Sequence, residues 1–167
     1  TFNPSLIGAR SAIVRISNDD YDEDPYTFSI QGTGTDPEMS VTGNGLEIDN
    51  GDSGPSADDH TDFGSADVDV DKVANTFTIH NSGNAALTLY GDPMIVVGGD
   101  HSTSVERPVV KESISPWSPY LSIEMTFNPS LIGARSAIVR ISNHDYSEDT
   151  YTFAIQRTGT DPEPRVT

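Results

Sequence analysis

Residues 49–71 form the stretch of the sequence with the most side chains able to ligate a cation, with eight Asp among several Gly and Ser. Calcium is the cation to consider, because it takes about six to eight oxygen ligands from carboxylates and carbonyls. The spacing differs from an EF-hand loop, in which a fixed order of ligands ends in a bidentate Glu. A solvated acidic loop is therefore favoured, and a Ca²⁺ site would draw its ligands from Asp49, Asp52, Asp58, Asp59 and Asp62.

A second acidic cluster occurs twice, at residues 18–24 and 143–149. The later copy has His144 and Ser147 where the earlier copy has Asp19 and Asp22, so two carboxylates are missing from it. An obligatory metal cage would not tolerate that loss. Asn and Asp side chains also form turns by bonding to nearby backbone, and this interpretation is favoured over a weak cation site.

Neither a catalytic triad nor a phosphate-binding loop is predicted, because neither has in this sequence the structural context that its chemistry requires. His60 lies beside Asp58 and Asp59 with Ser53 and Ser56 nearby, yet a catalytic triad is a three-dimensional arrangement that chance crowding in one loop does not supply. No Gly-rich phosphate loop follows a strand and opens a helix. We expect no enzyme activity and no nucleotide site.

Trp117 and Tyr120 are the aromatic candidates for binding a sugar. Trp117 lies between Pro116 and Pro119. A Trp in such a turn is expected to plug the end of a β-sandwich rather than to form a sugar platform, and this first alternative is favoured.

The elements that position these residues are organised around a repeat. Residues 1–38 recur at 126–163, offset by 125 residues, with five changes: Asp19 to His144, Asp22 to Ser147, Pro25 to Thr150, Ser29 to Ala154 and Gly32 to Arg157. A period of this length has the size of a whole domain rather than of a solenoid unit. We therefore expect residues 1–37 to be the last strands of a preceding repeat, 38–160 to be one complete domain, and 161–167 to begin the linker to the next.

Alternation of apolar and polar residues predicts strands in both copies and between them. Ala12, Val14 and Ile16 share one face of the first expected strand, and Tyr26, Phe28 and Ile30 share one face of the next. Residues 33–38 have the Gly and Pro of a joint, and residues 49–71 are expected to form a long excursion. No segment has helical periodicity. The chain is predicted to be all-β, with an antiparallel Ig-like sandwich of seven to nine strands.

Several phrases of the sequence resemble a known family. These are TDFGSADVD, NTFTIHNSGNAALTL, FNPSLIGARSAIVRISN and YTFAIQRTGT, in this order. They resemble the Hydin-like (ASH-type) immunoglobulin-like modules of large bacterial proteins called choice-of-anchor D domains. The resemblance implies an Ig-like sandwich in a cell-surface or secreted multi-domain protein, with no catalytic residue and no assigned ligand. Arg157 departs from the GTG of the family phrase, which Gly32 keeps.

Charge and composition limit the partners. The net charge of −17 argues against a nucleic-acid partner, which needs a basic surface. The chain has no Cys and no apolar run of the roughly 20 residues that span a bilayer. We expect an extracellular or cell-surface location.

The first copy of the repeat carries the functional prediction. Its apolar face lacks the rest of its own domain, and leaving each large side chain in water forgoes about 1.5–3 kcal/mol. We therefore expect residues 1–31 to pack against the equivalent of residues 38–125 in a neighbouring copy or repeat, through strand complementation or tandem linkage. The prediction is a structural module of an extracellular bacterial fibre, stalk or adhesin. The alternative is a carbohydrate- or surface-binding module of a large secreted protein, with a surface polysaccharide as its candidate partner. The expected interface residues are Phe2, Val14, Ile16, Tyr26, Phe28 and Ile30.

Overall fold

The computed structural model describes residues 6–68, 71–106, 108 and 110–161. The chain forms two compact units, Thr1–Asp36 and Pro37–Thr167. The division falls inside the segment 33–38 that was expected to be a joint.

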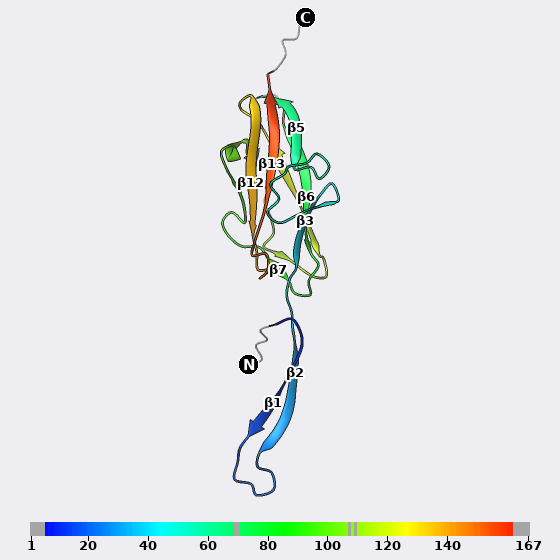
Figure 1. Ribbon diagram of the computed structural model, residues 1–167, viewed down its shortest axis with the longest axis vertical. Coiled ribbons are helices and arrows are strands. Elements are labelled where there is room, and N and C mark those ends of the chain that lie inside the picture. Colours follow the sequence, from blue (N-terminus) through cyan, green and yellow to red (C-terminus); the bar gives the residue numbers. More distant parts are fainter. Residues whose placement is uncertain (1–5, 69–70, 107, 109, 162–167) are drawn as a thin grey trace, which may run out of the picture. The chain divides into compact units, whose positions relative to one another are not determined.

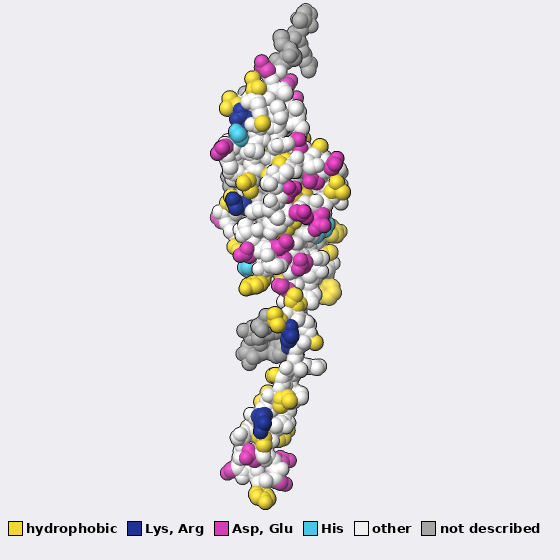
Figure 2. Space-filling model, in the orientation of Figure 1, with side chains coloured by type: hydrophobic (Ala, Val, Ile, Leu, Met, Phe, Trp, Pro, Cys, Tyr) yellow, Lys and Arg dark blue, Asp and Glu magenta, His cyan; other side chains and the backbone are white. Residues whose placement is uncertain are grey.

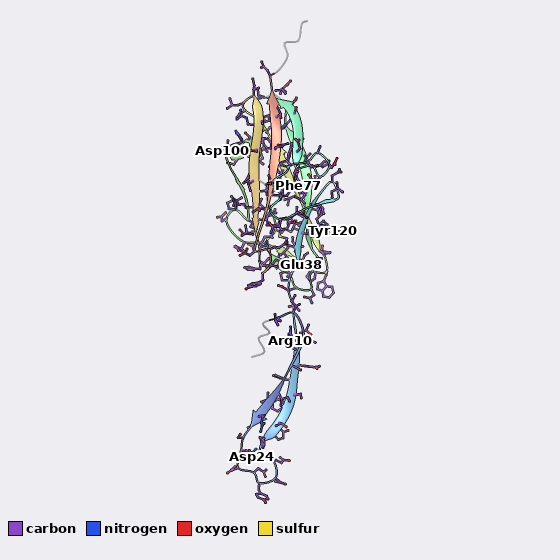
Figure 3. All side chains as sticks on the ribbon, viewed as in Figure 1. Arg10, Asp24, Glu38, Phe77, Asp100 and Tyr120 are labelled. Atoms are coloured by element: carbon purple, nitrogen blue, oxygen red, sulfur yellow. The ribbon has the colours of Figure 1, made fainter. Side chains whose placement is uncertain are left out.

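The first unit is a β-hairpin. β1 (Gly8–Ile16) pairs antiparallel with β2 (Tyr26–Gly34), and an acidic loop joins them (Figure 1). Both strands alternate apolar and polar side chains, which favours an extended chain with one apolar face. Figure 3 labels Asp24 in the loop at one end of the hairpin and Arg10 toward the other end.

The second unit is built from two main sheets. A five-stranded sheet has the order β4-β3-β6-β11-β9, and a four-stranded sheet has the order β5-β13-β12-β8 (Figure 1). The strands of the five-stranded sheet are β3 (Met39–Gly43), β4 (Leu46–Ile48), β6 (Val73–Asn81), β9 (Val105–Glu106) and β11 (Tyr120–Phe127). Those of the four-stranded sheet are β5 (Asp62–Asp67), β8 (Ile95–Gly98), β12 (Gly133–Ser142) and β13 (Thr150–Thr160). A small pair, β7 (Leu87–Thr88) with β10 (Ser113–Ile114), and one 3-10 turn at Ser102–Ser104 complete the unit.

The core lies between the inner faces of the two sheets. Phe77 of β6 contacts Phe153 of β13, with ring centroids 5.5 Å apart, and Figure 3 places Phe77 in the interior of the sandwich. Phe63 of β5 packs against both Phe77 and Phe127. Alternate residues of β6, β11, β12 and β13 are buried, because successive side chains of a strand point to opposite faces of its sheet.

The predicted all-β sandwich is confirmed. A tight turn joins β3 and β4, with Asn44 at φ 51° and Gly45 at φ 78°. The strand count was wrong: the second unit has eleven strands within its described residues, β3 to β13, against the seven to nine predicted. Three of these strands, β7, β9 and β10, are only two residues long, which is too short for an alternation pattern to register.

The topology also differs from the wholly antiparallel prediction. β5 lies inside the acid-rich segment that was expected to be an excursion, and it pairs parallel with β13. Its alternation is broken by a register shift opposite Gln156 and Thr158, and Gly64 has a positive φ of 71°. A bulge of this kind changes which side chains face inward, so a period-two pattern does not appear in the sequence.

No helix in the described part of the chain is long and apolar enough to cross a membrane.

Candidate assembly site

The β1–β2 hairpin and the β12–β13 hairpin have the same pairing. Gly8 pairs with Gly34 and Ile16 with Tyr26; at an offset of 125 residues, Gly133 pairs with Gly159 and Ile141 with Tyr151. Every register position between these ends corresponds as well. The repeated sequence therefore folds into the same local structure in both units.

The two hairpins differ in what covers them. In the second unit the inward residues of β12 and β13 are buried against the five-stranded sheet, and Phe153 is 1% exposed. In the first unit the equivalent Phe28 is 44% exposed. The remaining pairs show the same contrast, with Ile16, Tyr26 and Ile30 exposed where Ile141, Tyr151 and Ile155 are buried.

The predicted interface residues are thus brought together on one face of the hairpin. Val14 pairs with Phe28 and Ile16 with Tyr26 in the β1–β2 register, and Ala12 pairs with Ile30 beside them. The rings of Tyr26 and Phe28 lie 6.4 Å apart. Phe2, the sixth predicted residue, lies outside the described residues. This exposed apolar face is the candidate functional site.

The acidic loops at the ends of the two hairpins are turns, as predicted. Asn143 Nδ2 donates to the Glu148 carbonyl at 2.6 Å, and the Asp145 amide donates to Asn143 Oδ1 at 2.7 Å. In the first unit Asn18 Nδ2 donates to the Glu23 carbonyl at 2.9 Å, and the Asp20 amide donates to Asn18 Oδ1 at 2.7 Å. The turn therefore forms whether or not the rest of a domain is present.

One loop residue makes a contact only in the complete domain. Asp145 is fully buried, and its Oδ2 accepts a hydrogen bond from the Met39 amide at 2.8 Å, where the chain enters β3. Asp20 occupies the same position in the exposed loop of the first unit. The sequence does not predict this contact, because Met39 and Asp145 are 106 residues apart and a long-range backbone contact leaves no local pattern.

Tyr151 makes a second contact of this type. Its hydroxyl donates to the Ile48 carbonyl at 2.5 Å within the core. Burial, followed by the negative charge of Glu148, raises the pKa of Tyr151 to about 12. The equivalent Tyr26 of the first hairpin is exposed. In a complete domain, a tyrosine at this position has a backbone carbonyl as its partner, as Tyr151 does.

Of the five carboxylates proposed for calcium, three accept hydrogen bonds from the protein itself. Asp52 Oδ1 accepts from the Gly54 amide, buried Asp59 Oδ1 accepts from Thr61 Oγ1 at 2.6 Å, and Asp62 Oδ2 accepts from Gln156 Nε2 at 3.0 Å. Asp49 and Asp58 are exposed. Among the residues that the structure describes, no three His, Cys, Asp or Glu side chains are grouped to hold a metal ion. Calcium binding stays a prediction from the sequence.

The aromatic plug predicted for the end of the sandwich was wrong. Trp117 is 93% exposed, in a turn where the Ser118 amide donates to the Ser115 carbonyl at 3.1 Å. This end is closed instead by buried Asn81, whose side-chain amide donates to the Ala85 and Ile114 carbonyls. Tyr120 is exposed too, and Figure 3 shows its ring pointing outward.

The outer surface of the second unit has one further feature. A groove of about 400 Å³ lies over the outer face of β12 and β13, lined among others by Ser53, Asp100, Ser136, Ile138 and Gln156. Figure 2 shows many Asp and Glu side chains and few Lys or Arg on the visible face of this unit. The groove is mixed in polarity and contains no buried charged group.

Comparison with known proteins supports the fold. No protein-family model matches the chain, and no curated protein matches it in sequence. In structure the chain is similar to a protein of unknown function from Porphyromonas gingivalis W83, with a TM-score of 0.54 and 11% identity over 93% of this chain and 68% of that one. An ASH/PapD-like domain of human CEP192 gives a TM-score of 0.44 and 11% identity over 62% of this chain and 83% of that domain. At such identities the similarity concerns the fold alone.

Proposed function

We propose that this protein is a structural module of a tandem array. In each repeat of the array, a C-terminal hairpin packs against the strands that precede it and completes their β-sandwich. One observation carries the proposal: the apolar inward face of the same hairpin is covered in the second unit and exposed in the first. We name residues 37–125 the body, since they lie between the two hairpins in the sequence and cover the inward face of β12 and β13. The β1–β2 hairpin is expected to require another body of this type.

The hairpin cannot complete the body that directly follows it. In the second unit, Met39 contacts Asp145 in the loop that precedes β13, whereas Thr160 ends β13. Figure 3 labels Glu38 at the end of the sandwich opposite the arrowhead of β13. From Thr150 to Thr160 a strand rises about 33 Å. If β2 took the place of β13, the four-residue step from Thr35 to Met39 would have to cover that length, but it reaches about 14 Å at most.

The energy of the exposed face also favours a partner. An isolated two-stranded hairpin is marginally stable in water, and each large apolar side chain gains about 1.5–3 kcal/mol when it is fully buried. Phe28, Ile30, Tyr26 and Ile16 all have this burial still to gain. A body that covers them would gain main-chain hydrogen bonds along both edges of the hairpin, as β8 and β5 do beside β12 and β13.

Such pairing makes an array in which domains follow one another along the chain. The resemblance to choice-of-anchor D domains supports placing the array in a cell-surface or secreted bacterial protein, as a fibre, stalk or adhesin. In this proposal the module acts as a spacer, catalyses no reaction, and has neighbouring repeats as its partners.

The test is an extended chain in which residues 37–125 are placed before Thr1, so that the β1–β2 hairpin follows a body directly. Hydrogen exchange is measured on peptides covering β2 and β13, which differ in mass at residues 29 and 154. We expect β2 amides to exchange freely in the chain of residues 1–167 and to become protected in the extended chain. Unchanged exchange of β2 in the extended chain, and also in its variant with the Arg of the second copy at this position (Gly32→Arg), would overturn the proposal.

A second function is favoured by the exposure of Trp117. Trp117 and Tyr120 are both exposed on the second unit, as a carbohydrate platform requires. If the module binds a surface polysaccharide, immobilised bacterial polysaccharide should retain the chain, and Trp117→Ala should abolish the retention while leaving the thermal melt unchanged. Equal retention of the variant would exclude Trp117 from such a site.

A further inference from the structure

Of the five differences between the two hairpins, one is buried within the complete domain. Arg157 is 1% exposed and lies on the inward row of β13, after Tyr151, Phe153 and Ile155. The other four positions of the second hairpin, His144, Ser147, Thr150 and Ala154, are exposed or half-buried. The first hairpin has Gly32 at the position of Arg157.

Arg157 joins the two sheets at one end of the sandwich. Its Nη1 donates to the carbonyl of Phe127, at the end of β11, at 2.5 Å. Burial lowers the pKa of Arg157, and the negative charge of Asp71 opposes that change. Asp71 lies in the body, and Phe127, although it belongs to the repeated segment, ends β11 of the facing five-stranded sheet. The contacts of Arg157 therefore connect the hairpin to the sheet that covers it.

A glycine at this position leaves those contacts unmade. The long side chain would be replaced by empty space, the Phe127 carbonyl would lose its partner, and a glycine within a strand has no side chain to pack. Buried Nε and Nη2 of Arg157 have no hydrogen-bond partner within the described structure, which reduces the advantage of Arg. The filled space and the hydrogen bond to Phe127 are the two contributions that favour Arg over Gly.

Gly32 gives the first hairpin no side chain where β13 presents the bulky Arg157. A pocket of about 430 Å³ lies beside it, lined by Arg10 and Gly32 of the inward row and by Ala9, Ser11, Gln31 and Thr33 of the outward row. The absent side chain leaves room at position 32 of the inward face. A covering segment can fill that room with a side chain of its own.

We propose that the residue at this position, Arg157 in one hairpin and Gly32 in the other, determines which body each hairpin packs against. This inference rests on the proposed function. Body 37–125 is fitted to a hairpin with Arg at this position. The β1–β2 hairpin is fitted to a body of another repeat, which carries a larger side chain opposite Gly32. The difference keeps near-identical repeats paired in order, since strand exchange between neighbours is a characteristic failure of repeat proteins.

The extended chain that tests the proposed function also tests this inference, because its two bodies are identical and its hairpins differ. Hydrogen exchange at β2 and β13 is compared in the parent and in the variants Gly32→Arg and Arg157→Gly. We expect Gly32→Arg to slow β2 exchange, and Arg157→Gly to accelerate β13 exchange, each by at least about tenfold, or about 1.4 kcal/mol. Ser29→Ala, a matched change between the copies at an outward position, should alter neither.

The outcomes separate the two proposals. Unprotected β2 in the parent and in Gly32→Arg overturns the proposed function. Protected β2 with no slowing by Gly32→Arg overturns the assignment by Arg157 and leaves the proposed function standing. If Arg157→Gly prevents folding of its domain, Gly32→Arg still decides, because it leaves the second domain unchanged.

Discussion

At the scale of single residues, the carboxylate of Glu148 shows how acidic side chains oppose folding in this protein. Burial, followed by repulsion from Asp145, Glu38 and Glu47, raises the pKa of Glu148 above its ordinary 4.5. A raised pKa in the folded state stabilises the fold at pH values below the unfolded pKa, and this contribution is lost as the pH rises through the folded value. Ionised Glu148 is therefore a cost at neutral pH.

We predict that Glu148→Gln raises the melting temperature of the second unit at pH 7 and leaves it unchanged near about pH 3, where both side chains are neutral. The hydrogen bond that Asn143 donates to residue 148 goes to its backbone carbonyl, so the substitution keeps it. Thermal melts followed by circular dichroism at both pH values provide the measurement. Glu124→Gln on the exposed face of β11 is the control, and an equal gain at both pH values would contradict the assignment to ionised Glu148.

At the scale of elements, the repeated hairpins provide a matched pair for measuring what burial contributes. Phe153 and Phe28 occupy the same place in the same register. We predict that Phe153→Ala lowers the free energy of unfolding of the second unit by about 3–5 kcal/mol, as for other buried Phe residues. Phe28→Ala should leave that value unchanged in the chain of residues 1–167. Urea unfolding followed by circular dichroism measures both free energies. A loss of similar size from Phe28→Ala would show that the apolar face of the first hairpin is already covered.

The element scale also shows which parts of the fold could be predicted from the sequence. β11 alternates Ile123, Met125 and Phe127 with polar residues and packs between two neighbours, so its pattern and its burial agree. β5 could not be predicted, because its buried residues Phe63 and Ala66 are separated by a bulge that shifts the inward face.

The candidate site was predictable to the extent that it depends on repetition. Residues 1–38 and 126–163 are nearly identical, so the sequence predicts that the same apolar side chains are buried in both hairpins. In the second hairpin these side chains are buried, and in the first they are the ones expected to pack against a partner. Asp145 and Tyr151 could not be identified in this way, since their partners Met39 and Ile48 lie about a hundred residues away in sequence. The burial of Asn81 could not be predicted either, because its side-chain amide donates to the carbonyl of Ile114, 33 residues away in sequence.

At the scale of the whole molecule, negative charge outweighs positive charge, because 26 acidic residues face 9 basic ones. The ion pair of Lys72 with Glu106 has N and O atoms 2.6 Å apart, but both side chains are exposed, and exposed pairs contribute little. Most of the negative charge is thus balanced by solution ions rather than by protein cations. Self-repulsion of this kind destabilises a compact state and is screened by salt.

We predict that the melting temperature of residues 1–167 rises as NaCl increases from about 10 mM to about 500 mM, where the screening length falls from about 30 Å to a few Å. Calcium chloride and magnesium chloride, compared at equal ionic strength, separate screening from binding. Because no described acidic residues are grouped as a metal site, we expect the two divalent salts to act alike. A ligand that binds only the folded state adds stability in proportion to the logarithm of its concentration, so an additional rise specific to millimolar calcium, removed by Asp59→Asn, would instead establish a calcium site in the segment 49–71.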